Sequence, residues 1–282
     1  MKSVRSGSAE RSVGLSIALV AGLLAGASPA AAAGLVALAP HRAVYDLTLV
    51  QSKGLKAPTS ARGRIAYDFS GSSCEGYVAN FRQMVELDPA EGPQRVTDMR
   101  SATFEDGEAK NFRFEIDTRV DGQQNENIDG SVARSADGAL SVKLQRPKAG
   151  NFDLDRDILF PTEHMRRILT AARAGETIVQ AKVFDGSETG EKVYDTLTVI
   201  GRPPGDEASE QAAHNAALQG LTRWPVAISY FDRDKADDVP AYVMSFDLYE
   251  NGIARALRID YGDFVLAGEM TSLEVMAQHP CQ

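Results

Sequence analysis

The chain has 282 residues, of which 43% are hydrophobic and 24% are charged. This is the composition of a globular protein, and it excludes collagen-like, disordered and coiled-coil classes. The formal net charge is −9 and there is no long run of Lys or Arg. These features argue against nucleic acid as the main partner, because phosphate binding needs a concentrated basic surface.

The first 33 residues have the pattern of a secretory signal peptide. Lys2, Arg5 and Arg11 form a basic start, an uncharged apolar stretch follows, and an alanine-rich segment ends at Ala33. The alternative, a transmembrane anchor, needs roughly 20 apolar residues, and this stretch is shorter. No later segment is long and apolar enough to span a membrane. We therefore predict cleavage after Ala33 and a single mature domain over residues 34–282.

Alternation of apolar and polar residues dominates the mature chain. In residues 111–120, every second side chain from Phe112 to Val120 falls on one face, which is typical of a half-buried strand. The same alternation recurs in residues 140–144, 242–248 and 253–261. Together with the shorter apolar runs, it predicts about twelve to fourteen strands.

Asp-Gly and Asn-Gly pairs separate these runs. They supply the positive φ angles of tight hairpins, so they predict an antiparallel meander. The pairs are Asp106-Gly107, Asp121-Gly122, Asp129-Gly130, Asp137-Gly138, Asp185-Gly186 and Asn251-Gly252.

Two segments depart from the strand pattern. Apolar residues recur at helical spacing from Met165 to Ala172, with Pro161 before them and Gly175 after them as start and stop signals. They predict a helix of about three turns that plugs the end of a barrel or lies against the sheet.

Residues 203–222 begin with a Pro-Pro-Gly sequence and are then rich in Ser, Glu, Gln and Ala. They predict an exposed, flexible loop, in which a helical turn can form.

The predicted elements define an all-β fold. One short helix cannot cover the apolar faces of a dozen strands, so the sheet must curl on itself as a barrel, half-barrel or sandwich. We predict a single large, antiparallel and strongly curved sheet. Such a sheet can enclose an apolar cavity, although an interior filled by side chains gives the same alternation.

The chemical motifs yield no candidate catalytic, cofactor-binding or metal residue. The acidic run Asp153-x-Asp155-x-Asp157 lacks the glycine and glutamate that a calcium loop requires. Nucleophile-elbow, P-loop and dinucleotide fingerprints are missing from the sequence. Four histidines without zinc-site spacing are expected at the surface or as caps: His41, His164, His214 and His279. We therefore expect a non-enzymatic protein without a cofactor.

Trp224 is the single tryptophan and lies beside a proline at the start of a predicted strand. Core packing is the expected role, and a place at the mouth of a ligand site is the alternative.

The mature chain has two cysteines, Cys74 and Cys281. In an exported protein, an even number favours a structural disulfide that would tie an early strand to the end of the chain. Two unpaired buried thiols and a redox-active pair are the alternatives. The missing C-x-x-C spacing disfavours a redox-active pair.

Several motifs along the mature chain resemble one known family. They are APHRAVYDL at 39–47, Y-x-F-x-G at 67–71, CEGY at 74–77, SFDLYENG at 245–252 and LRIDYGDF at 257–264. This combination resembles the EipB family of alphaproteobacterial periplasmic cell-envelope integrity proteins, which is catalogued as a domain of unknown function. The likeness extends over residues 39–281.

The resemblance implies a spiral of antiparallel strands, similar to the half-barrels of the lipoprotein carriers LolA and LolB. It implies a periplasmic location and a stabilising disulfide between Cys74 and Cys281, which match the family's cysteine positions. It also implies a tetratricopeptide-repeat protein as a partner, and it brings no catalytic residues. We therefore expect a monomer that binds a lipid, lipoprotein or other hydrophobic ligand. A protein-interaction scaffold is the alternative.

Overall fold

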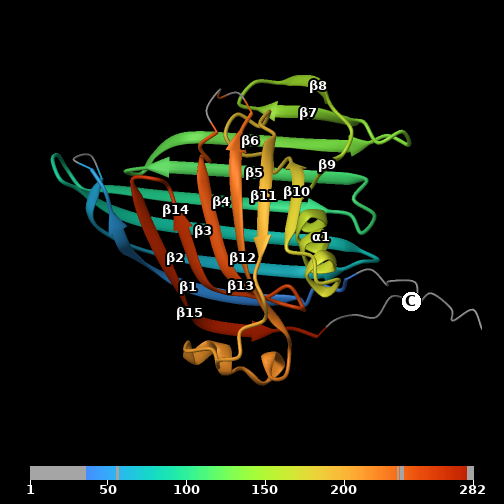
Figure 1. Ribbon diagram of the computed structural model, residues 1–282. Coiled ribbons are helices and arrows are strands. Elements are labelled where there is room, and N and C mark those ends of the chain that lie inside the picture. The colour runs from blue at the N-terminus through green and yellow to red at the C-terminus, as the bar shows by residue number, and fades with distance from the viewer. Residues whose placement is uncertain (1–35, 55–56, 234, 236–237, 278–282) are drawn as a thin grey trace, which may run out of the picture. The chain divides into compact units, whose positions relative to one another are not determined.

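The strands of the described residues pair into one sheet, which Figure 1 shows for the computed structural model. The structure describes residues 36–54, 57–233, 235 and 238–277. The predicted signal peptide and its cleavage site lie outside the described residues. Fifteen strands curl until the sheet is nearly closed into a barrel. The predicted all-β class with a curved, largely antiparallel sheet and one short helix is therefore confirmed.

The sheet has two arms, each of which follows the order of the chain. The first arm contains β1 (His41–Ser52), β2 (Pro58–Ser72), β3 (Gly76–Pro89), β4 (Arg95–Glu105), β5 (Asn111–Val120), β6 (Gln123–Arg134), β7 (Leu140–Arg146) and β8 (Gly150–Leu154). The second contains β9 (Ile158–Leu159), β10 (Ile178–Val183), β11 (Tyr194–Ile200), β12 (Arg223–Asp232), β13 (Tyr242–Tyr249), β14 (Ala254–Asp260) and β15 (Phe264–Val275).

The two arms join in the middle of the sheet, where β1 pairs with β15. The order across the sheet runs from β8 down to β1 and then from β15 down to β9. Neighbours are antiparallel, except that β9 and β10 are parallel. The edge strands β8 and β9 are consecutive in the chain, so the two sides of the gap in the barrel are connected through residues 155–157.

Alternating burial explains why these segments form strands. In β5, Phe112, Phe114 and Ile116 are buried, whereas Arg113 and Glu115 between them are exposed. The apolar face turns into the barrel and the charged face turns outward, as the alternation predicts. The strand predicted over residues 111–120 is confirmed with these bounds.

The dipeptide signals predicted some turns correctly and one wrongly. Asp121 and Gly122 have φ angles of 53° and 78° and connect β5 to β6, as a tight hairpin requires. Asp129-Gly130 instead lies inside β6. A Cβ atom on Gly130 would lie 2.5 Å from the Phe114 ring, so the glycine makes room for a core aromatic side chain and forms no turn.

The predicted helix is confirmed as α1 (Pro161–Arg173), which lies beside β10 in Figure 1. Its residues Ile168 and Leu169 are fully buried in a cluster that includes Tyr77 of the first arm and Leu248 of the second. The helix therefore fills part of the barrel interior and contributes to the contact between the two arms.

Most of residues 203–222 are exposed, but a few side chains in the central part are buried. Two short 3-10 helices form there, η1 (Gln211–His214) and η2 (Ala216–Leu218), and Ala213 and Leu218 are buried. The carboxylate of Glu210 accepts hydrogen bonds from the N–H groups of Ala256 in β14 and Met270 in β15. The segment covers the place where these two strands diverge, and it satisfies backbone groups that have no sheet partner there.

Candidate ligand cavity

A cavity of about 240 Å³ lies between the two arms of the sheet. Strands β1 to β4 form one wall, β13 and β14 form the opposite wall, and the first turn of α1 closes one side. The cavity exists partly because Ala79 stands between Phe69 and Thr103 in the strand register. Its short side chain leaves space between two larger neighbours.

The lining of this cavity is predominantly apolar. Aromatic, thioether and aliphatic side chains from both arms and the helix face it, namely Phe69, Phe81, Met165, Met244, Phe246 and Leu257. Methionine side chains adapt to irregular shapes, so Met165 on the helix and Met244 on β13 suit a site for a flexible apolar ligand. No Lys, Arg, Asp or Glu is among the described residues that line the cavity.

The polar groups of the cavity come mainly from β1 and β2. The Tyr45 hydroxyl donates a hydrogen bond to the carbonyl oxygen of Ala254 at 2.7 Å, which ties one wall to the other. His41 is buried, and its Nδ1 lies 2.8 Å from the carbonyl oxygen of Ala39. Its ring lies beside that of Tyr67, with the two ring centres 5.5 Å apart.

The protonation of His41 follows from its surroundings. Burial lowers the pKa of the imidazole, so the ring is neutral at neutral pH. A carbonyl oxygen accepts hydrogen bonds and never donates them, so the proton of the neutral ring resides on Nδ1, opposite Ala39. The second nitrogen, Nε2, is then a hydrogen-bond acceptor.

Glu105 holds the helical wall of the cavity in place. Its carboxylate accepts hydrogen bonds from the N–H groups of Thr162 and Glu163, both at 2.8 Å, at the start of α1. Anions at a helix N-terminus interact favourably with the free N–H groups there. Burial nevertheless raises the pKa of Glu105 to about 7, because the cost of removing a carboxylate from water exceeds the effect of these bonds.

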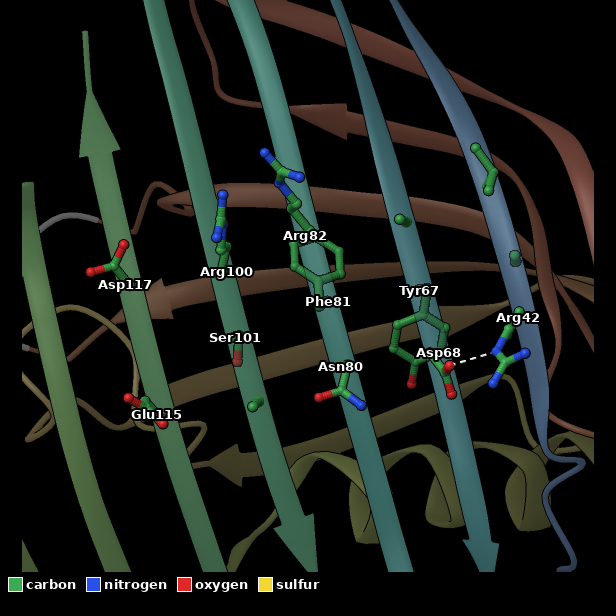
Figure 2. A pocket seen from close by; sticks show the side chains of 14 residues that line it. Arg42, Tyr67, Asp68, Asn80, Phe81, Arg82, Arg100, Ser101, Glu115 and Asp117 are labelled. Atoms are coloured by element: carbon green, nitrogen blue, oxygen red, sulfur yellow. Dashed lines mark hydrogen bonds and ion pairs between the residues drawn. The ribbon is translucent and has the colours of Figure 1, made fainter. Parts of the chain in front are cut away.

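A second candidate site is a trough of about 590 Å³ on the outer face of β1 to β5, shown in Figure 2. Its charged side chains are three arginines, Arg42, Arg82 and Arg100, and three acids, Asp68, Glu115 and Asp117. Small residues such as Ala66 and Ala102 form its floor.

The charges of this trough neutralise one another across the strands. Arg42 Nε lies 2.6 Å from Asp68, and the neighbouring Asp98 accepts hydrogen bonds from both Arg82 and Arg100. Exposed pairs of this kind contribute little to stability. Equal numbers of both signs also give the trough no net attraction for a simple anion or cation.

Of the two cysteines predicted to form a disulfide, Cys74 lines neither candidate site. Cys74 is in the turn between β2 and β3, and Cys281 lies outside the described residues, so their pairing stays a prediction. Two of the histidines expected at the surface, His41 and His164, are buried. His214 is exposed, and His279 lies outside the described ranges. Trp224 is buried in the core, as expected.

The described residues offer no resident metal site and no membrane helix. Clusters of three or more possible metal-ligating side chains do not occur among them. Within the same ranges, no helix combines the length and the apolar character that a membrane crossing requires.

Comparison with known proteins is consistent with this architecture. A family model described as EipB-like matches residues 32–277. The cell envelope integrity protein EipB of Brucella abortus (strain 2308) is 41% identical over 253 residues, covering 88% of each chain. A crystal structure from Brucella abortus, described as a β-barrel-like protein of a domain of unknown function, aligns with a TM-score of 0.79 and 39% identity. The alignment covers 85% of this chain and 99% of the chain in that crystal structure.

The nearly closed sheet with its interior cavity defines a β-barrel-like protein. Because the family model spans most of the chain and the curated relative is similar over most of its length, the chain belongs to the EipB-like family. It is a homologue of a cell envelope integrity protein.

Proposed function

We propose that this protein supports cell-envelope integrity in the periplasm by holding a single hydrophobic chain of a lipid or lipoprotein in the cavity between the arms. The observation that carries the proposal is the cavity itself, which has apolar walls from both arms and no charged lining residue in the described part of the chain. Its relative is named as an envelope integrity protein, which supports the same cellular setting.

The size of the cavity limits the ligand. Pockets for small molecules usually have about 300–1,000 Å³, and this one has about 240 Å³. A single acyl chain suits this volume better than the body of a two-chain phospholipid. The remainder of the ligand would extend outside the barrel.

Filling the cavity tests this function. The substitution Ala79→Leu introduces a larger side chain between Phe69 and Thr103, and it is expected to abolish binding of a hydrophobic ligand. Ala133→Leu is the matched control, because Ala133 is exposed on a strand of the same sheet. Binding is measured by native mass spectrometry of protein released gently from the periplasm.

The expected result is a lipid-sized adduct on the wild type and on Ala133→Leu, and none on Ala79→Leu. Thermal unfolding of both variants shows whether they are folded. Equal adduct occupancy in all three proteins would contradict binding in this cavity. Exclusion of every hydrophobic probe from the wild type would reject the proposal itself.

The outer trough suits a second candidate function, an interaction scaffold, for which the family resemblance suggests a tetratricopeptide-repeat protein as the partner. Ion pairs beside small side chains suit a polar protein interface, in which charged groups provide specificity for one partner over others. Reversing Arg82 and Arg100 to Glu is expected to remove a crosslinked partner in intact cells. The exposed Arg95, which is not among the lining residues, provides the control Arg95→Glu. Unchanged crosslinking in the double variant would reject this surface.

A further inference from the structure

We infer that the cavity selects an uncharged ligand whose polar end is a hydroxyl group. The inference rests on the proposed function, because it concerns the ligand class of the same cavity. It follows from the polar atoms that His41 and Tyr67 present to the cavity and from the charges that surround it.

An anionic ligand has no positively charged partner among the described residues that line the cavity. The described lining residues include no Lys or Arg, so a carboxylate or phosphate would be buried without a compensating charge. An acidic group beside the cavity disfavours an anion further. Glu105 is bound to the N–H of Thr162, which itself lines the cavity, and its charge also acts on Tyr67.

The hydrogen-bonding atoms specify what the ligand must carry. His41 Nε2 is an acceptor, because the proton of the neutral ring is on Nδ1. The Tyr67 hydroxyl is a donor, because burial raises its pKa far above neutral pH and keeps it protonated. Within the described part of the chain, neither atom has a hydrogen-bond partner on the protein.

A hydroxyl group satisfies both atoms. It can donate to His41 Nε2 and accept from Tyr67, and the adjacent rings place these two side chains on the same wall. A carboxylate, phosphate or ether accepts but cannot donate. An ammonium group donates but cannot accept. Each of these would leave one of the two protein atoms unsatisfied, which disfavours binding.

Three probes with the same alkyl chain test the inference on the mature protein. They are n-octanol, n-octyl methyl ether and octanoate, titrated by calorimetry at pH 8, where octanoate is ionised. We expect n-octanol to bind about tenfold more tightly than octanoate, and the ether to bind less tightly than n-octanol. Octanoate binding as tightly as n-octanol, or ether binding as tightly as n-octanol, would overturn the inference and leave the proposed function intact.

A variant pair locates the selectivity. Tyr67→Phe removes one hydroxyl without changing the shape of the ring, so it is expected to weaken n-octanol binding severalfold. Tyr230→Phe is the control, because Tyr230 stacks on Tyr242 and is not among the cavity residues. Equal binding by all three proteins would overturn the role of Tyr67 and the inference with it. Failure of every probe to bind the folded wild type would reject both the inference and the proposed function.

Discussion

Two buried residues near the start of α1 change their proton affinity in opposite directions on folding. Burial raises the pKa of Glu105 from 4.5 to about 7. Burial, together with the nearby charge of Arg167, lowers the pKa of His164 from 6.5 to about 4. Glu105 therefore stabilises the fold most below pH 4.5, and His164 stabilises it most above pH 6.5.

Because these two pKa shifts have opposite effects on the free energy of unfolding, the substitution Glu105→Gln should change how that free energy depends on pH. As the pH rises from 4.5 to 7, the Glu105 contribution to the free energy of unfolding falls by about 3 kcal/mol. The His164 contribution rises by a similar amount between pH 4 and 6.5, and His41 acts in the same direction. In Glu105→Gln, the free energy of unfolding should therefore rise more steeply with pH than in the wild type.

Urea unfolding at intervals from pH 4.5 to 8 measures this difference in slope. The slope is more informative than the absolute stability, because Gln is also a poorer acceptor for the two N–H groups of α1. Parallel pH profiles for Glu105→Gln and the wild type would show that Glu105 does not titrate in this range.

The sequence contained a signal for the burial of both histidines. His41 is in phase with Ala43, Tyr45 and Leu47, which face the interior of the barrel. His164 lies four residues before Ile168, on the buried side of α1. Their periodic position outweighed the usual preference of histidine for the surface. The protonation state and tautomer of His41 could not have been found from the sequence, because they depend on the contact with Ala39 and on burial in three dimensions.

Among the elements, the segment between β11 and β12 depends on one buried ion pair. Arg255 Nε lies 2.6 Å from Glu210, and the two side chains are 8% and 6% exposed. Arg255 also contacts Asp247, which in turn contacts Arg223. The pair therefore connects the 203–222 segment to the outer side of β13 and β14.

Breaking this pair should destabilise the protein strongly. Glu210→Ala leaves Arg255 with less compensation and leaves two backbone N–H groups unsatisfied, so we expect a loss of about 3 kcal/mol or more. Asp206→Ala is the matched control in the same segment. Asp206 is 77% exposed, and its removal should cost less than about 1 kcal/mol. Urea unfolding that shows equal losses for the two variants would contradict this account.

Element prediction succeeded where one physical signal dominated. The alternation in β5 and the helical spacing in α1 arise from burial on one face, so sequence alone located them. The 203–222 segment has no periodic apolar face, and its burial depends on a gap between β14 and β15 that no local pattern reveals. Gly130 resembled a turn residue because close approach to a ring and a tight hairpin both require glycine.

At the scale of the whole molecule, the sequence predicted that the sheet curls around an interior, but it did not predict that this interior contains a cavity. Excess apolar strand surface required the sheet to curl, and the structure confirms this. Whether the facing side chains meet depends on their register, for example on Ala79 falling between Phe69 and Thr103. The same alternation would occur in a filled barrel, so the cavity emerges only from the folded structure.

The predicted disulfide would link distant parts of this molecule. Cys74 lies in the turn between β2 and β3, and its predicted partner Cys281 follows β15 outside the described residues. Closing such a long loop stabilises a protein by at most about 5 kcal/mol in the chain-entropy model. We therefore expect Cys74→Ser and Cys281→Ser to lower the melting temperature equally, and reductant to lower that of the wild type. Unchanged melting in all three experiments would contradict the pairing.

The order of the strands has a consequence for folding. In the described chain, every pairing joins strands that are consecutive in sequence except that of β1 with β15. Each arm can therefore form by adding neighbouring strands, at the low entropic cost of closing short loops. The central pairing can form only after both β1 and β15 have been synthesised and meet. In a circularly permuted chain that began at β9 and ended at β8, the order of the strands along the chain would match their order across the sheet, so no pairing would join distant strands.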